Sequence, residues 1–217
     1  MALALFDLDN TLLADDSDFL WGCFLVDKGL VDKTTYDEAN KRFYDDYKKG
    51  TLNIFEFLAF SLKPLTLYSA EKLSELHSEF MHRHIRPVMT EKGIKQIQHH
   101  HDKGDITVII TATNSFVTAP IAKAFQVDDL IATEPEMVDG KYTGKVAGTP
   151  CFQQGKVTRL KQWLEETSHD LKDSTFYSDS HNDLPLLECV SRPVAVDPDV
   201  ELKAIAIENN WEICSFR

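Results

Sequence analysis

The feature that most constrains the fold is a strand-like segment that a long helical stretch separates from all later strands. Residues 2–6 form a short apolar run, which is typical of a buried strand. From about residue 17 to residue 103, apolar residues recur at helical spacing. Strand-like and helix-like segments then alternate, beginning with the β-branched run 106–110. The alternation predicts an α/β fold with a doubly wound parallel sheet and helices on both faces.

The helical stretch is interpreted as an insertion after the first strand. We expect a catalytic core formed by residues 1–14 and 88–217, and a helical cap domain at residues 15–87. Further core strands are predicted at 130–132, 174–177, 194–196 and 211–214, with a hairpin turn at 138–141.

Capping residues indicate where the helices of the insertion begin and end. Ser17 is suited to cap the first of them. The helix that Ser69 opens is expected to finish before Pro87, because proline disfavours helical backbone in the residue that precedes it.

Composition restricts the class of protein. The 217 residues are enough to bury a core, and 35 acidic against 23 basic residues give a net charge of -12. This balance argues against a nucleic-acid partner, because phosphate contacts need clustered cations. No apolar stretch approaches the ~18 residues that span a bilayer, and residues 1–6 are too short for a signal peptide. The four cysteines lack CxxC spacing. We expect a cytoplasmic monomer or homodimer without a membrane partner.

Two carboxylates stand directly after the first predicted strand. Alternation along an extended segment puts Asp7 and Asp9 on the same side of the chain. In an open parallel sheet, ligands bind at the carboxyl ends of the strands. Carboxylates this close repel each other unless a cation, a shared proton or hydrogen bonds compensate. A simple turn is the alternative, since Asp and Asn are common turn residues.

Polar residues occupy comparable places later in the chain. A hydroxyl residue ends the strand 106–110, a lone lysine begins a helix, and two carboxylates follow a third strand. These residues are Thr111 with Ala112, Lys156, and Asp179 and Asp183 with Asn182 between them. A hydroxyl and free amides at a strand end can hold phosphate oxygens. The order of the elements favours one shared site over independent turns.

These elements resemble the motifs of the haloacid dehalogenase (HAD) superfamily, and within it subfamily IB, the phosphoserine-phosphatase-like branch. Asp7, Asp9 and Thr11 match the DxDxT motif in full. The resemblance covers essentially the whole chain, and it implies a Rossmann-like core with a helical cap of type C1. Two positions depart from the pattern: Asn10 stands where Gly or Ser is frequent, and Ser178 where Gly usually precedes the first acid.

The resemblance implies a phosphatase and a role for each matched residue. Asp7 is the nucleophile that forms an aspartyl-phosphate, and Asp9 is first the general acid and then the base. Mg²⁺ is the expected cofactor, held by the Asp7 and Asp179 carboxylates and by the backbone carbonyl of Asp9. The remaining expected contacts are phosphate binding by Thr11, Thr111, Ala112 and Lys156, orientation of Lys156 by Asp183, and a substrate or phosphate contact by Asn182.

The insertion is expected to select the substrate, a small phosphorylated metabolite. The acids Asp15, Asp16 and Asp18 are either a solvated helix start or a patch for a substrate cation. The resemblance puts Asp16 where related phosphatases meet the substrate amine, which implies an amine-bearing ester such as phosphoserine or histidinol phosphate. Phosphoserine would also need a cation for its carboxylate, and the insertion offers Arg42, Arg83 and Arg86.

Several aromatic residues and histidines of the chain leave their roles open. Trp21, Phe43 and Tyr44 could line a substrate pocket, although their helical spacing favours core packing. The consecutive residues His99, His100 and His101 do not share a helix face, and neither do His82 and His84. Both patterns disfavour a histidine metal site. His181 lies within the last motif, and the sequence assigns it no role.

Three other functions use related residues. A phosphomutase or another phosphotransferase would form the same intermediate on Asp7 and exclude water. A regulatory protein that stores an aspartyl-phosphate also groups acids at strand ends, but it needs neither Asp9 nor a large helical insertion. A dehalogenase is disfavoured, because Asp9 and the metal acid Asp179 indicate phosphorus chemistry.

Overall fold

A mostly parallel sheet forms the centre of the protein. In the computed structural model, which describes residues 2–217, seven strands pair in the order β4-β3-β2-β1-β5-β6-β7. They are β1 (Leu3–Phe6), β2 (Ile106–Asn114), β3 (Asp129–Val138), β4 (Lys141–Ala147), β5 (Thr175–Ser178), β6 (Arg192–Val196) and β7 (Glu212–Cys214). All neighbours are parallel except β3 and β4, which form the antiparallel hairpin. The predicted doubly wound α/β fold is confirmed.

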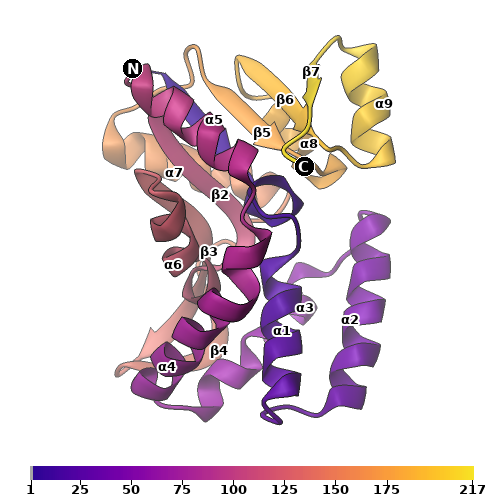
Figure 1. Cartoon of the computed structure of the whole chain (residues 1–217), viewed down its shortest axis with the longest axis vertical. Coiled ribbons are helices and arrows are strands. Elements are labelled where there is room, and N and C mark those ends of the chain that lie inside the picture. The colour runs from indigo at the N-terminus through magenta and orange to yellow at the C-terminus, as the bar shows by residue number, and fades with distance from the viewer. Residues whose placement is uncertain (1) are drawn as a thin grey trace.

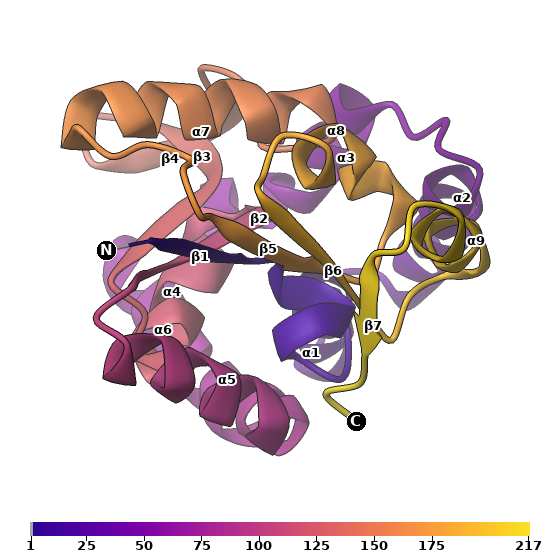
Figure 2. The same ribbon diagram turned by 90° about the horizontal axis from the view of Figure 1, so that it is seen from above.

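Helices cover both faces of the sheet. They are α1 (Ser17–Asp27), α2 (Lys33–Lys48), α3 (Ile54–Ser61), α4 (Ala70–Phe80), α5 (Glu91–Asp102), α6 (Ser115–Phe125), α7 (Gln154–Thr167), α8 (Leu184–Leu187) and α9 (Val200–Glu208). Figure 2 shows α5 and α6 below the sheet and α7 and α8 above it. The side chains of β1 alternate accordingly: Phe6 packs in the lower apolar cluster and Leu5 in the upper one. Within residues 2–217, no helix has both the length and the apolar character that crossing a membrane requires.

The strand order reverses beside β1, which pairs with β2 on one side and with β5 on the other. At such a reversal the loops that leave neighbouring strands diverge and open a crevice at the carboxyl edge of the sheet. The segments that follow Phe6, Thr113 and Ser178 therefore meet at one place, which brings the predicted motif residues together.

The helices α1 to α4 gather beyond this carboxyl edge, together with the β3–β4 hairpin (Figure 1). Four buried leucines of α3, α4 and the intervening turn form their own apolar cluster, against which Tyr142 and Val146 of β4 pack: Leu58, Leu62, Leu65 and Leu73. The hairpin thus supplies part of the packing surface of the insertion. The boundaries 15–87 stay a prediction.

Two boundaries differ from those expected. Asp16, rather than Ser17, caps α1, because its side chain accepts the backbone N–H of Phe19 at 2.9 Å. After α4 the chain continues through the π-helical turn Met81–Ile85 and the 3-10 turn Arg86–Val88, so helical turns extend across Pro87. Proline is tolerated there because it occupies the start of a new turn, where no helical partner needs its N–H.

His77 of α4 joins the insertion to the core. Its ring is 4% exposed and lies against Trp21 of α1 and Phe116 of α6, with ring centroids 5.9 and 5.3 Å away. Its Nε2 pairs with the carbonyl oxygen of Val117 at 2.9 Å, and this nitrogen donates because the oxygen can only accept. Burial lowers the pKa of His77 below its ordinary value, so the folded protein holds this ring neutral.

We expect His77 to stabilise the fold less at acid pH. The unfolded chain takes up a proton at the ordinary histidine pKa while the folded ring resists it, so stability from His77 is present above this pKa and is lost as pH falls. The free energy of unfolding of the wild type and of His77→Gln would be measured with urea from pH 8 to pH 5. The difference between the two proteins at each pH removes the contribution of all other titrating groups. That difference should shrink below the ordinary pKa by at most about 1.4 kcal/mol per pH unit. A pH-independent difference would contradict the assignment.

Candidate active site

Asp7 leaves β1 at the strand reversal, and the backbone fixes its position. Its N–H donates to the carbonyl of Tyr177 in β5 at 2.9 Å, which continues the pairing of the two strands by one residue. The chain then forms a tight π turn, Leu8–Leu12, in which Asn10 has φ 60°. Asn is among the few non-glycine residues that adopt this left-handed conformation readily. Asn10 therefore replaces the frequent glycine without distorting the loop.

A buried lysine links the first and last motifs. Nζ of Lys156 lies 2.7 Å from the Asp7 carboxylate and 2.8 Å from that of Asp183, and the lysine is 2% exposed. Burial opposes its charge, but the two carboxylates outweigh this and raise the pKa of Lys156 above its ordinary value. Asp183 also accepts the hydroxyl of Ser178 at 2.7 Å. Ser178, in place of the usual glycine, thus helps to hold the acid that orients the lysine.

A hydroxyl group bridges two of the acids. Oγ1 of Thr11 lies 3.1 Å from Asp179 and 3.4 Å from Asp7, and it also accepts the N–H of Asp179 at 3.1 Å. Burial and the neighbouring acid Asp183 raise the pKa of Asp7 to about 7, although Lys156 lowers it. Burial and repulsion from Asp7 raise the pKa of Asp179 well above its ordinary value. Asp7 and Asp179 therefore concentrate negative charge at this place, and Lys156 neutralises only part of it.

Hard oxygen donors of this kind fit a magnesium ion. Within residues 2–217, no three His, Cys, Asp or Glu side chains form a ready-made metal site. The expected set needs only two side chains, Asp7 and Asp179, because a backbone carbonyl, phosphate and water supply the other oxygens. Burial, together with repulsion from neighbouring carboxylates, raises the pKa of both acids, and a divalent cation between Asp7 and Asp179 would relieve that repulsion.

Asp9 lies within the turn Leu8–Leu12 and is held by two donors. The N–H of Ser17, at the start of α1, reaches its Oδ1 at 2.7 Å, and the hydroxyl of Thr113 reaches its Oδ2 at 2.8 Å. Thr111 makes a longer contact of 3.4 Å with Oδ2. Burial and repulsion from Asp16 raise the pKa of Asp9 to about 6. Such a group can both give and accept a proton near neutral pH.

Thr113 is a site residue that the sequence reasoning missed. It lies two positions after Thr111 in β2, so alternation places both hydroxyls on one side of the strand. This spacing was the available signal, and it was hidden because the predicted strand ended at residue 110.

The loop after β5 is tied to the end of α2. The hydroxyl of Tyr47 donates to Ser180 at 2.8 Å, and the side-chain amide of Asn182 donates to the Tyr47 carbonyl at 3.2 Å. Gln153, just before α7, donates to Asn182 at 2.8 Å and to the carbonyl of Gly50 at 3.4 Å. Asn182, expected to contact substrate or phosphate, here joins the insertion to the last motif.

The acids at the start of α1 adjoin Asp9. Burial is the main cause that raises the pKa of both Asp16 and Asp18. Repulsion from Asp15 and Asp7 adds to the shift of Asp16, and repulsion from Asp16 and Asp9 adds to that of Asp18. Asp16 caps α1, Asp15 accepts the N–H of Asp16 at 2.8 Å, and Asp18 accepts the amide of Asn114 at 3.3 Å. The structure therefore places an acidic group at the rim of the site, on the side of Asp9.

Comparison with known proteins decides the family. The model of haloacid dehalogenase-like hydrolases matches residues 4–188, from β1 through the last motif. The chain belongs to this family. The predicted resemblance is confirmed, and the chain is a hydrolase of the HAD superfamily.

Individual proteins of known sequence or structure are similar to this HAD hydrolase over its whole length. A protein of Neisseria meningitidis serogroup C (strain 8013) named histidinol-phosphatase is 46% identical, over 99% of both chains. A phosphoserine phosphatase of Mycobacterium tuberculosis (strain ATCC 25618 / H37Rv) is 32% identical, over 100% of this chain and 71% of the relative. A crystal structure of a Bordetella pertussis Tohama I protein has a TM-score of 0.93 at 44% identity, covering 100% of this chain and 99% of the other.

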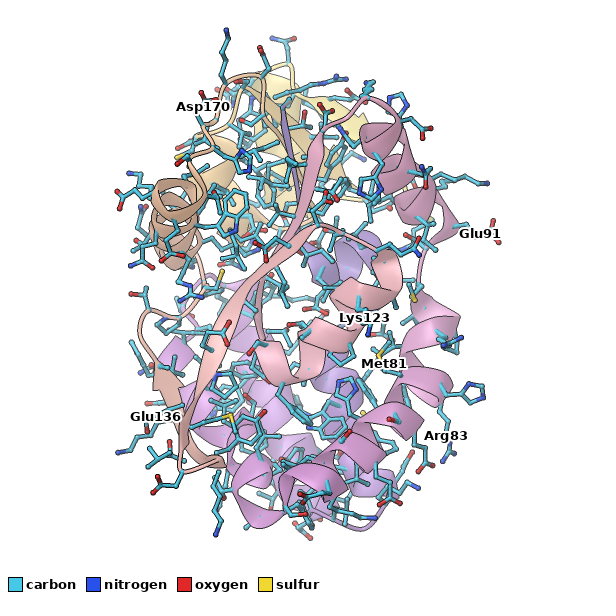
Figure 3. All side chains as sticks on the ribbon, turned by 90° about the vertical axis from the view of Figure 1, so that its left-hand side faces the viewer. Met81, Arg83, Glu91, Lys123, Glu136 and Asp170 are labelled. Carbon is cyan, nitrogen blue, oxygen red and sulfur yellow. The ribbon has the colours of Figure 1, made fainter. Side chains whose placement is uncertain are left out.

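The arginines of this hydrolase's insertion lie away from the catalytic acids. Arg83 is on the outer surface, where it pairs with Glu79 at 2.9 Å (Figure 3). Arg42 is exposed on α2 with its guanidinium over the ring of Phe43, and Arg86 is exposed beside the groove between α4 and α6. Among the contacts of residues 2–217, none joins these arginines to Asp7.

The aromatic residues considered for a substrate pocket differ in how deeply they are buried. Trp21 and Phe43 are buried in apolar packing, which agrees with their helical spacing, whereas Tyr44 is 57% exposed. The aromatic residue of α2 that reaches the site is Tyr47, whose ring lies 6.2 Å from that of Phe152. The sequence reasoning missed Tyr47, because no motif marks a side chain that acts across the two parts of the chain.

The histidines of the HAD chain make separate contacts. His100 pairs with Asp105 at 2.9 Å, whereas His101 points to Thr107 at 2.8 Å. His181, in the last motif, pairs with Asp199 at 2.7 Å through Nδ1, and its backbone N–H donates to the same carboxylate at 2.8 Å. His181 thus fixes the loop after β5 to the start of α9.

We expect Gly155 to be essential for the position of Lys156. A Cβ atom at residue 155 would lie 2.0 Å from the carbonyl oxygen of Pro150, a contact that the backbone can relieve only by moving the start of α7. Gly155→Ala should therefore lower hydrolase activity about tenfold or more and lower the stability by about 1–3 kcal/mol. Gly104→Ala is the control: its Cβ meets open space but its φ of +76° strains alanine, so this variant should lose stability and keep kcat. Unchanged kcat and unfolding midpoint in Gly155→Ala would refute this.

Proposed function

We propose that this HAD hydrolase is a Mg²⁺-dependent phosphomonoester phosphatase that acts through an aspartyl-phosphate on Asp7. The observation that carries the proposal is the Lys156 ammonium between Asp7 and Asp183, at 2.7 and 2.8 Å, with a second acid of raised pKa, Asp9, two residues after Asp7. The arrangement provides a nucleophile, a cation for phosphoryl oxygens and a proton donor within one crevice. The names of the relatives support the phosphatase activity.

In the first step, the ionised carboxylate of Asp7 attacks phosphorus. A bond forms between Asp7 and phosphorus, the ester P–O bond breaks, and the leaving oxygen takes the proton of Asp9. Lys156 and the hydroxyl of Thr111 are proposed to hold the phosphoryl oxygens, where charge accumulates. The raised pKa of Asp9, about 6, favours the protonated form that this step needs.

In the second step, Asp9 acts as a base. A water oxygen attacks phosphorus, its proton passes to Asp9, and the bond between phosphorus and Asp7 breaks, which releases inorganic phosphate and restores both acids. When bound to Asp7, Asp179 and the Asp9 carbonyl, Mg²⁺ would offset the repulsion between the anionic nucleophile and the anionic ester.

We infer that the substrate is an amine-bearing ester of the histidinol phosphate type. The acids Asp16 and Asp18 adjoin Asp9, so the group beyond the phosphoryl oxygen meets negative charge. The exposed arginines of the insertion leave a substrate carboxylate without a cation from that side. Phosphoserine is the second candidate, favoured by the relative at 32% identity.

The catalytic proposal predicts that Asp7→Asn abolishes turnover without unfolding the protein. Loss of the nucleophile should reduce phosphate release by about a thousandfold or more. EDTA should abolish wild-type activity and Mg²⁺ should restore it. Asp45→Asn, at an exposed acid of α2, serves as the control and should keep full activity. Near-normal release by Asp7→Asn would refute the mechanism, and transfer to an acceptor alcohol in place of release would indicate a phosphotransferase.

The substrate proposal predicts a charge-specific effect of Asp16→Asn. Asparagine still caps a helix, so the substitution removes the charge and keeps the start of α1. The kcat/KM for histidinol phosphate should fall about tenfold, whereas that for p-nitrophenyl phosphate should change less than about twofold. Equal losses on both esters, or a preference of the wild type for phosphoserine, would contradict the proposal.

A further inference from the structure

A second cavity lies away from the catalytic crevice, between α5 and the C-terminal segment. Figure 2 shows α5 and the C-terminal segment on the same side of the sheet, below β5 and β6. The cavity has a volume of about 380 Å³. This falls within the range of small-ligand sites, ~300–1,000 Å³. It is lined by Lys92, Gln96, His99, His100, Lys103, Tyr177, Arg192, Glu212, Cys214, Ser215 and Phe216.

One face of α5 forms a wall of this cavity. Lys92, Gln96, His99 or His100, and Lys103 follow one another at intervals of three or four residues, the spacing of a single helix face. This face is polar and cationic, and Lys92, His99 and Lys103 on it are exposed. His99 and His100 of the histidine run belong to this wall, whereas His101 contacts Thr107 instead.

The floor of the cavity is a fixed hydrogen-bond network. Asp105 lies 2.9 Å from Nδ1 of His100, so this nitrogen donates to the carboxylate. Nε2 is then the acceptor for the hydroxyl of Tyr177, at 2.9 Å, and Gln96 donates to the same hydroxyl at 2.8 Å. His100 and Tyr177 are each 6% exposed. The floor is polar, satisfied and held in place.

The cavity is positive in a chain whose net charge is -12. Three cations line it, Lys92, Lys103 and Arg192, against one acid, Glu212, which pairs with Arg192 at 2.6 Å. Among residues 2–217, neither lysine forms an ion pair with an acidic side chain; Lys92 instead donates to the carbonyl of Arg217. The Lys103 ammonium is thus available to a ligand, whereas that of Lys92 is already engaged by Arg217.

We propose that this cavity binds a small organic anion that carries a carboxylate or phosphate group. Its charge would lie at Lys103, and its body on Tyr177 and Phe216. The binding site does not depend on the proposed phosphatase activity.

The cavity also touches the catalytic strand. The ring of Tyr177 stacks on Phe6, with centroids 4.7 Å apart, and the Tyr177 carbonyl accepts the N–H of Asp7. The C-terminal wall continues to Arg217, whose guanidinium donates to the carbonyl of Asn10 at 2.7 Å. A ligand in the cavity therefore contacts both segments that support the turn after β1, which gives it a route to affect the nucleophile.

Cys214 allows occupancy to be measured without enzyme activity. It lines the cavity, and burial with the acids Glu212 and Asp197 raises the pKa of its thiol to about 11, so it reacts slowly with maleimide. Modification of Cys214 would be followed by mass spectrometry of its peptide, in a zwitterionic buffer without added metal or carboxylate chelator. The exposed thiol of Cys189 is an internal control in the same sample.

Succinate and glycerol 3-phosphate, the carboxylate and phosphate probes, should slow modification of Cys214 about threefold when present at about twice their Kd, and leave Cys189 unaffected. Sodium chloride at equal ionic strength should not protect. Lys103→Glu should remove the protection, whereas Lys95→Glu, which makes the same charge change on α5 outside the cavity, should retain it.

Protection by only one probe would identify the anionic group that the site prefers and would support the proposal. Failure of both probes to protect Cys214, equal protection by sodium chloride, or protection that survives Lys103→Glu would each overturn it. Because the readout is local, loss of phosphatase activity in Asp7→Asn would leave this result unchanged, so the two proposals can fail separately.

Discussion

The contact of Lys156 with Asp7 and Asp183 is the interaction on which the rest of the site depends. Buried carboxylates repel one another and lose their hydration, and removing one partner of such a buried group typically costs about 3–5 kcal/mol. The lysine is 2% exposed and links the end of β1 to the loop after β5. Its position requires α7 to start close against Pro150, which only Gly155 permits. A backbone contact directly before Lys156 thus sets the position of the lysine against Asp7.

The strand ends could be predicted from the sequence, because polar residues there interrupt apolar runs. Asp7, Thr111 and Asp179 each follow such a run, and parallel strands bring their carboxyl ends together. Thr113 could not be found in this way, since the β-branched run appeared to end at residue 110 while the strand continues to Asn114. Propensity marks where a strand is strongest but not where its hydrogen bonding stops.

Contacts between the insertion and the core were beyond the sequence for a different reason. The bonds of Tyr47 to Ser180 and of Asn182 to the Tyr47 carbonyl join residues more than a hundred positions apart. Helical spacing identifies which residues share a face but not what that face meets. Tyr44 and Tyr47 lie three positions apart on α2, and only the packed structure distinguishes the exposed ring from the one at the site.

The start of α1 shows how one residue can serve both fold and selectivity. Asp16 caps the helix, and its ionised form is favoured by the N–H of Phe19, whereas burial and nearby carboxylates disfavour it. The N–H of the next residue, Ser17, simultaneously holds Asp9. A cationic group on a bound ester would tip this balance toward ionised Asp16 and would not weaken the cap. An anionic group would meet repulsion from the same carboxylates that the fold requires. In the proposed mechanism, the helix start therefore favours a cationic substrate group as a consequence of how it holds Asp9.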